Sequence, residues 1–178
     1  VDYTDMQVFL TAPSGIGFVV DNAGEATIQG IEVELFVSPI DGLDLSASYA
    51  YLDTEIEKFE DEPGNVGNQL ARSPENSASL SAQYVTPVFD GIDLLLRADY
   101  SYQDSMFFDI DNSSVSASDD YDLVNVRLAL QAHSGWELAV WGKNITDEEY
   151  RVHGFDASFG DNLSAATIYG NPKMWGVS

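Results

Sequence analysis

The segment from Asp109 to Asp120 carries the side chains that are best suited to hold a hard cation. Asp109, Asp111 and Asp120 offer carboxylates, and oxygen ligands at alternate positions of a loop suit calcium. The segment departs from an EF-hand loop, because Ser114 stands where that loop needs glycine and Asp120 where it needs glutamate. We therefore hold two interpretations open: a divalent-cation site at the three aspartates, or a solvated acidic surface loop. No other cofactor is expected.

Side chains that carry acid–base or nucleophilic chemistry are scarce in this chain. It has no cysteine and two histidines, His133 in a short turn and His153 in a long loop. The sequence contains no Gly-x-Ser-x-Gly, no His-Glu-x-x-His and no glycine-rich phosphate loop. We expect a protein that is not an enzyme.

The charge balance excludes one class of partner. Thirty acidic and seven basic residues give a formal net charge of −23. Nucleic-acid binding needs Lys and Arg to neutralise phosphates, so nucleic acid is not an expected partner. The balance favours cationic ligands, divalent ions or simple solubility, and it does not choose among them.

A further set of charged residues lies within regions that alternate between apolar and polar side chains. All its members fall on the polar side of that alternation: Glu32, Glu34, Asp44, Asp93, Arg97, Asp99 and Arg127. If this side lines the interior of a barrel, the set either contacts water and another domain there or lines a path for a substrate. Because an unpaired buried charge is costly, we expect Arg97 and Arg127 to pair with carboxylates on neighbouring strands.

The elements that position these residues are strands, since the dominant period of the sequence is two. Leu43, Leu45, Ala47 and Tyr49, for example, alternate with polar or small residues, and a helix would scatter them around its circumference. We predict an all-β chain without helices and with eight strands, near residues 2–11, 26–38, 43–56, 75–86, 92–106, 121–132, 136–150 and 173–178. Alternation alone does not tell which side meets water. A soluble sandwich turns its apolar side inward, and a membrane barrel turns it to lipid.

The connections favour an antiparallel up-and-down transmembrane barrel. Short turns at 38–42, 86–91 and 132–135 separate long polar loops near 12–25, 57–74, 107–120 and 151–172. Strands of about ten residues also match the length that crosses a bilayer at a tilt. Four tyrosines next to long loops are interpreted as an aromatic girdle or as ordinary strand formers: Tyr49, Tyr51, Tyr100 and Tyr102.

Several segments resemble the barrels of TonB-dependent outer-membrane receptors, in the order and spacing of that family. Residues 22–26 (NAGEA) followed by 29–32 (QGIE) are similar to one family segment. Residues 136–150 (WELAVWGKNITDEEY) resemble the penultimate strand and its exit, and residues 172–177 (PKMWGV) resemble the start of the final strand. The resemblance covers nearly the whole chain and is greatest to receptors for iron complexes.

This resemblance implies a barrel of 22 strands closed by a plug. Residues 1–178 are expected to supply about eight C-terminal strands, with the plug, the N-terminal strands and the end of the final strand lying outside the chain. The implied partners are those strands and the plug, the TonB complex through the plug, outer-membrane lipid with lipopolysaccharide, and a small-molecule ligand such as a ferric siderophore. The implied location is the outer membrane of a Gram-negative bacterium.

Ligand capture in that family uses outer loops, so aromatic residues on the long loops become candidate contacts. They are Phe107, Phe108, Phe155, Phe159 and Tyr169. Two other functions stay open: a soluble acidic β-sandwich that binds carbohydrate or calcium, and a passive porin-like channel. The identity of the ligand is left open.

Overall fold

The computed structural model describes residues 2–4, 7–11, 18–22, 24–60, 62–156 and 165–178. Its regular structure is β apart from one 3-10 turn, η1 (Pro63–Asn65). The strands are β1 (Asp2–Thr4), β2 (Gln7–Thr11), β3 (Phe18–Asn22), β4 (Glu25–Ile40), β5 (Leu43–Lys58), β6 (Asn76–Phe89), β7 (Ile92–Gln103), β8 (Tyr121–Ala132), β9 (Glu137–Lys143), β10 (Arg151–Asp156), β11 (Ala165–Tyr169) and β12 (Met174–Val177).

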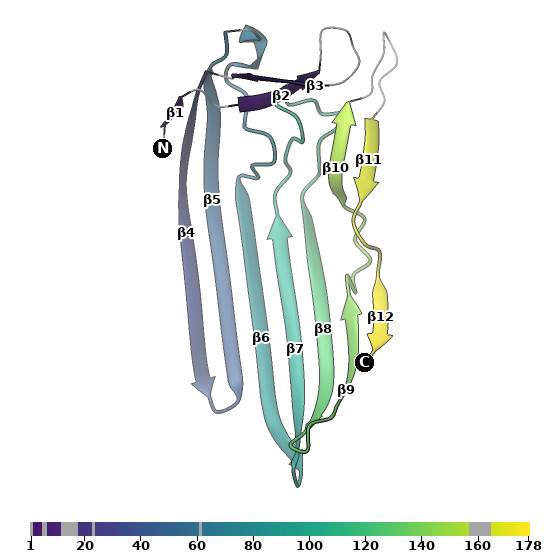
Figure 1. Cartoon of the computed structure of the whole chain (residues 1–178). Helices are drawn as coiled ribbons and strands as arrows, with labels where there is room; N and C mark the ends of the chain where they lie inside the picture. Colours follow the sequence, from purple (N-terminus) through teal and green to yellow (C-terminus); the bar gives the residue numbers. More distant parts are fainter. Residues whose placement is uncertain (1, 5–6, 12–17, 23, 61, 157–164) are drawn as a thin grey trace.

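Eight of these strands form one antiparallel sheet in the order β1-β4-β5-β6-β7-β8-β9-β12. From β4 on, each strand pairs with the next strand of the sheet along the chain, which is the up-and-down topology predicted from the sequence (Figure 1). The strand pairs β2–β3 and β10–β11 make two separate hairpins at the end of the molecule that carries the long loops. Within the described residues, no helix is long and apolar enough to span a membrane.

The N-terminal region and two of the long loops contain more strands than the sequence predicted. Residues 2–11 do not form one strand, because β1 pairs with β4 whereas β2 pairs with β3. The loops expected at 12–25 and 151–172 contain β3 and the β10–β11 hairpin. The strand predicted at 136–150 ends at Lys143, where Asn144 adopts a left-handed φ of 47° that stops the extended backbone. Among the described strands, β2 pairs only with β3, and β10 only with β11, so short runs without strong alternation also form strands.

The opposite ends of the long strands have tighter turns than predicted. β4 and β6 continue through Pro39 and Pro87 and turn only at residues 41–42 and 90–91, both Asp-Gly. Gly42 and Gly91 have φ angles of 79° and 70°, which glycine adopts without steric cost. A register shift precedes each turn, so the prolines lie where the ladder is already irregular.

The sheet has one apolar and one polar face. Strand register aligns Leu45, Ala82, Ala98 and Val126 in one row on the apolar face. Large apolar side chains of this face are exposed to solvent, for instance Leu80 at 53%. The neighbouring rows on the other face carry mostly serine, asparagine and charged side chains, as the sequence predicted.

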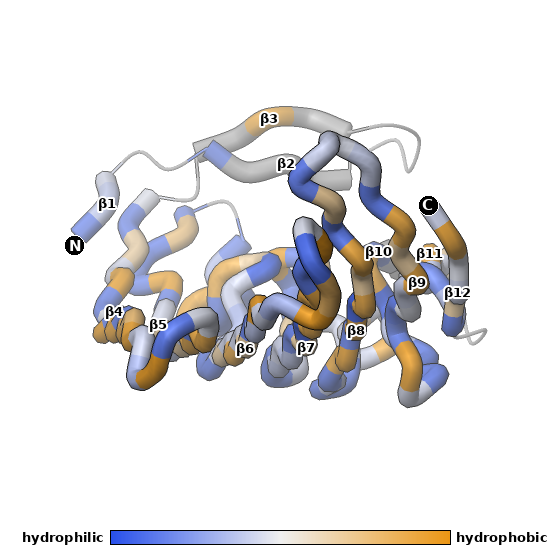
Figure 2. Tube along the Cα trace, turned by 90° about the horizontal axis from the view of Figure 1, so that it is seen from below, coloured by the Kyte–Doolittle hydropathy of each residue, from blue (hydrophilic) through white to orange (hydrophobic). Residues whose placement is uncertain are grey.

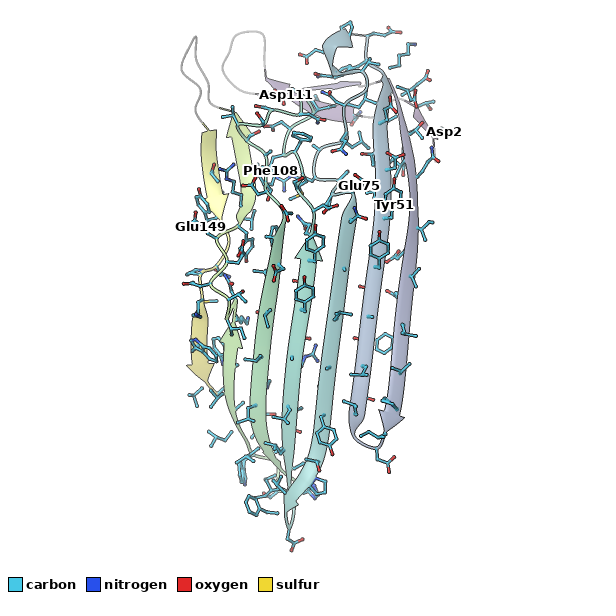
Figure 3. All side chains as sticks on the ribbon, turned by 180° about the vertical axis from the view of Figure 1, so that it is seen from behind. Asp2, Tyr51, Glu75, Phe108, Asp111 and Glu149 are labelled. Carbon is cyan, nitrogen blue, oxygen red and sulfur yellow. The ribbon has the colours of Figure 1, made fainter. Side chains whose placement is uncertain are left out.

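The sheet is a single curved layer. Figure 2 looks along the strands and shows that the sheet curves from β4 to β12. Figure 3 looks at the convex side, where the ring of Tyr51 lies in front of its strand. No second sheet covers the apolar face within the described residues, which contradicts the sandwich interpretation. An apolar face that is convex and uncovered is the arrangement of a membrane barrel wall.

The buried apolar core therefore lies mainly in the loops rather than under the sheet. Ile56 and Phe59 are 0% and 2% exposed, and they pack with Ile110 and Leu70. These residues come from the outer end of β5 and from the two long loops that follow. The loops are thus folded structures with their own apolar centre.

Candidate functional site

The long loops meet in one structured body, which we call the loop cluster: residues 59–75, residues 104–120 and β10. The first two segments are joined by reciprocal amide hydrogen bonds. Asn112 Nδ2 donates to the Gln69 carbonyl at 2.9 Å, and the Gln69 amide donates to Asn112 Oδ1 at 2.9 Å. Asn112 tolerates the left-handed φ of 52° that this position requires. Asn68 Nδ2 adds a bond to the Ile110 carbonyl at 2.9 Å.

The third segment, β10, is tied to the second by two hydrogen bonds and by close packing at a glycine. Arg151 Nη1 donates to the Ala117 carbonyl at 2.8 Å, and Ser118 Oγ donates to the Arg151 carbonyl at 3.3 Å. Gly154 is buried, and a Cβ added there would lie 2.7 Å from the Ser116 carbonyl oxygen. Close backbone approach therefore requires glycine at this position.

Phe108 joins all three segments. It is 4% exposed, its ring lies edge-on to the His153 imidazole at 5.9 Å between centroids, and the Arg72 guanidinium lies 5.7 Å from its centroid. Arg72 Nη2 also approaches His153 Nδ1 at 2.6 Å. The Arg72 amide donates to the Phe107 carbonyl at 2.8 Å. One arginine thus connects the first loop to both of the others.

The predicted aromatic ligand contacts do not converge on one surface within the described residues. Phe108 is used in the interior of the loop cluster, so it offers little surface to a ligand. Phe107 is half-buried, and Tyr169 on β11 is 51% exposed. Phe155 pairs with Ala166 in the β10–β11 hairpin, and Phe159 lies outside the described residues. A role of these residues in ligand binding stays a prediction.

The aspartates of the expected cation site have other surroundings. Asp109 Oδ2 accepts a hydrogen bond from Ser116 Oγ at 3.0 Å, and Asp111 and Asp120 are exposed. Across the described part of the chain, no three His, Asp or Glu side chains come together to hold a metal ion. This geometry gives the calcium interpretation no support, and the site stays a prediction.

The charged residues of the concave face form short-range pairs. Arg127 pairs with Glu137 across the β8–β9 ladder, and Gln131 Nε2 also donates to that carboxylate at 2.7 Å. This confirms the predicted pairing with a neighbouring strand. Arg97 is a correction: its Nη2 bonds Asp99 Oδ1 at 2.8 Å, on the same strand. Residues two apart in a strand share a face, so this partner is already in reach.

Three further members of this set, Glu32, Glu34 and Asp93, also lie on this face. Glu32 and Glu34 are exposed on the concave face, where β5 places Ala50 and Ser48 opposite them. Asp93 and His133 approach at 3.0 Å near a turn. Ser48 and Ser79 join their hydroxyls at 2.8 Å between these charges. The concave face therefore combines small hydroxyl side chains with mostly acidic ones, and it can contact water or polar groups.

A polar network at the outer rim was not predicted. Tyr49 Oη donates to Asn76 Oδ1 at 2.6 Å, and Asn76 Nδ2 donates to Asp104 Oδ2 at 2.6 Å. Tyr102 Oη donates to the other oxygen of Asp104 and thereby holds the pKa of that carboxyl below its usual range. Two tyrosines of the predicted girdle are thus fixed across β5, β6 and β7.

Asn144 is a second residue whose role the sequence reasoning missed. It is 4% exposed, and its Nδ2 donates to the Glu148 carbonyl at 2.8 Å and the Asn171 carbonyl at 3.1 Å. Its Oδ1 accepts from the Glu148 amide at 2.8 Å. Asn144 thereby ties the outer end of β9 to the segment before β12. An asparagine directly after a strand was the available signal, because asparagine enters the left-handed region more readily than most residues.

Comparison with known proteins gives the same architecture. The family model "TonB dependent receptor-like, beta-barrel" matches residues 1–145. The ferric yersiniabactin uptake receptor FyuA from Yersinia pestis is 22% identical and aligns with a TM-score of 0.80 over 99% of this chain and 25% of that receptor. BauA, the ferric preacinetobactin receptor from Acinetobacter baumannii, is 21% identical, with a TM-score of 0.68 over 96% and 25% of the two chains. The siderophore receptor PiuA from Acinetobacter baumannii is 20% identical, with a TM-score of 0.71 over 97% and 23%.

At this level of identity the solved structures establish the fold alone. The chain spans about a quarter of the length of each of these receptors. The family match covers most of the chain, and members of the family lie in the outer membrane of Gram-negative bacteria. The chain belongs to the TonB-dependent receptor β-barrel family.

Proposed function

We propose that the protein containing this chain imports a ferric siderophore or a similar iron complex across the outer membrane, with energy that the TonB complex transmits to a plug. Residues 1–178 supply C-terminal strands of the barrel. The remaining strands and the plug are their partners, and outer-membrane lipid with lipopolysaccharide surrounds the apolar face. The ligand binds from outside, near the loop cluster.

The observation that carries this proposal is the two-faced curved sheet within a chain of this family. Its convex apolar face suits lipid, and its concave face carries hydroxyl and carboxylate groups that suit a polar interior. Three structures that share the fold are described as receptors for ferric preacinetobactin, ferric yersiniabactin and siderophores. An iron complex is accordingly the first ligand class to test.

Uptake is tested with the intact receptor in a host that lacks its own siderophore receptors. Radiolabelled ferric complexes, beginning with the two named siderophores, are supplied under iron limitation with and without functional TonB. Saturable accumulation that depends on TonB supports the proposal. Accumulation that does not saturate and is unchanged without TonB overturns it in favour of a porin-like channel.

A matched pair of variants tests where the ligand binds. Tyr169 and Trp136 are both exposed aromatic residues, at 51% and 49%, but Tyr169 lies in the β10–β11 hairpin beside the long loops and Trp136 in the turn between β8 and β9. Tyr169→Ala is expected to raise the ligand concentration for half-maximal uptake several-fold, whereas Trp136→Ala leaves it unchanged. Equal effects of both variants would contradict a binding site at the outer loops.

A further inference from the structure

The contact between Arg72 and His153 has only one consistent protonation state. A guanidinium carries donors and no acceptor, so the Nδ1 atom 2.6 Å away must be the acceptor. The neutral tautomer with its proton on Nε2 offers this acceptor. Protonation of Nδ1 removes this hydrogen bond and places two cations within contact distance.

Among the side chains that the structure describes, no carboxylate forms an ion pair with His153. From residues 59–75, the charged group that faces His153 is Arg72 itself. From residues 104–120 the uncharged Phe108 ring packs on the imidazole, while the Asp109 carboxylate accepts a hydrogen bond from Ser116 Oγ. Within β10, Arg151 directs its guanidinium to a carbonyl, and Ile168 of β11 is the uncharged partner opposite His153. These side chains leave the imidazole beside an aromatic ring, a guanidinium and an apolar residue.

The Arg72–His153 pair also links two segments of the loop cluster that few other polar contacts among the described residues join. The joint between residues 59–75 and 104–120 has its own backbone and amide bonds, which do not involve His153. Between residues 59–75 and β10, by contrast, the hydrogen bond from Arg72 to His153 is the direct polar link among the described residues. Loss of this bond therefore weakens one side of the loop cluster selectively.

We propose that Arg72 and His153 form a pH-sensitive clasp, which holds β10 against the first long loop when His153 is neutral and opens this side of the loop cluster when His153 is protonated, while β10 stays bonded to residues 104–120. Histidine is the side chain that changes charge between about pH 5 and 8, so acidification of the cell exterior reaches this switch directly. Acidification alone opens the clasp, and no bound ligand is needed. It does not depend on which ligand the receptor imports.

The test measures the distance between the two clasped segments in the intact receptor in detergent micelles. Val66 and Val152 are 46% and 39% exposed and lie on the two sides of the clasp, so Val66→Cys and Val152→Cys carry spin labels. This chain has no cysteine of its own. At about pH 8 we expect one narrow distance distribution, and at about pH 5 a loss of at least about half of that population to longer distances.

Two histidine variants identify the group responsible. His153→Gln keeps an acceptor for Arg72 but does not titrate, so its distance distribution is expected to stay narrow at both pH values. His133→Gln changes the chain's other histidine, near a turn at the opposite end of the sheet, and is expected to respond like the unmodified receptor. The proposal is overturned if the labelled receptor shows no change with pH, or if His153→Gln opens on acidification as the unmodified receptor does.

Discussion

Replacement of Asn144 by alanine should loosen the junction between the outer end of β9 and the segment before β12. The change removes bonds to the Glu148 amide, the Glu148 carbonyl and the Asn171 carbonyl. A net hydrogen bond is worth about 0.5–1.5 kcal/mol, and alanine at a φ of 47° costs roughly another 1–2 kcal/mol. Because Asn171 is exposed and regains water, we expect a total of about 2–4 kcal/mol in the free energy of local opening.

The assay is hydrogen exchange in the intact receptor, followed on peptides that cover residues 144–150 and 171–178. A loss of 2–4 kcal/mol corresponds to exchange that is about 30 to 1,000 times faster, since each 1.4 kcal/mol is a factor of ten. Asn144→Gly removes the same bonds without the φ cost, so its effect should be smaller by about 1 kcal/mol. Exchange in Asn144→Ala that stays within about twofold of the unmodified receptor would refute the reasoning.

Three further predictions use the same receptor. Gly154→Ala should accelerate exchange in β10 by about tenfold or more, because its Cβ meets a carbonyl oxygen at 2.7 Å, whereas Gly64→Ala, with nothing within 4 Å, should not. Leu80→Lys on the apolar face should cost about 2–4 kcal/mol of insertion free energy and thereby lower the yield of folded receptor in membranes. Ser79→Lys on the concave face should be tolerated, and equal yields of the two variants would contradict the assigned faces. Because the pKa of Asp104 is lowered in the folded state, its ionised carboxylate stabilises the rim at pH values above its unfolded pKa of about 3.9. This stability is lost as the pH falls through the lower folded pKa. Asp104→Asn should therefore reduce the fall in melting temperature that the receptor shows at acidic pH.

Much of the architecture could be predicted because strand alternation is a local property. The run from Leu43 to Tyr51 shows on its own which residues share a face, and the order of short turns and long loops gives an up-and-down topology. That Arg127 pairs with a carboxylate of a neighbouring strand followed from the cost of an unpaired charge, although Glu137 itself was not predicted. The partner of Arg97 did not, because Asp99, two residues further along the same strand, is already within reach of its guanidinium.

The loop cluster could not be predicted, because its contacts join residues that are far apart in the chain. Gln69 and Asn112 are separated by 43 positions, and Arg72 and His153 by 81. A composition rule assigns such polar segments to solvated loops, and the family resemblance made Phe108, as an aromatic residue of a long loop, a candidate for ligand capture. Only the fold shows that Phe108 fills the interior of that cluster.

The sequence by itself determined that this chain is a two-faced antiparallel sheet with long loops at one end, since side-chain period and turn chemistry act over a few residues. The tertiary structure decided which face is convex and uncovered, because curvature and sheet closure depend on all strands together. It also decided that three outer loops form one body with a histidine at its joint, because that arrangement exists only after β5, β7 and β9 have brought the loops to one end.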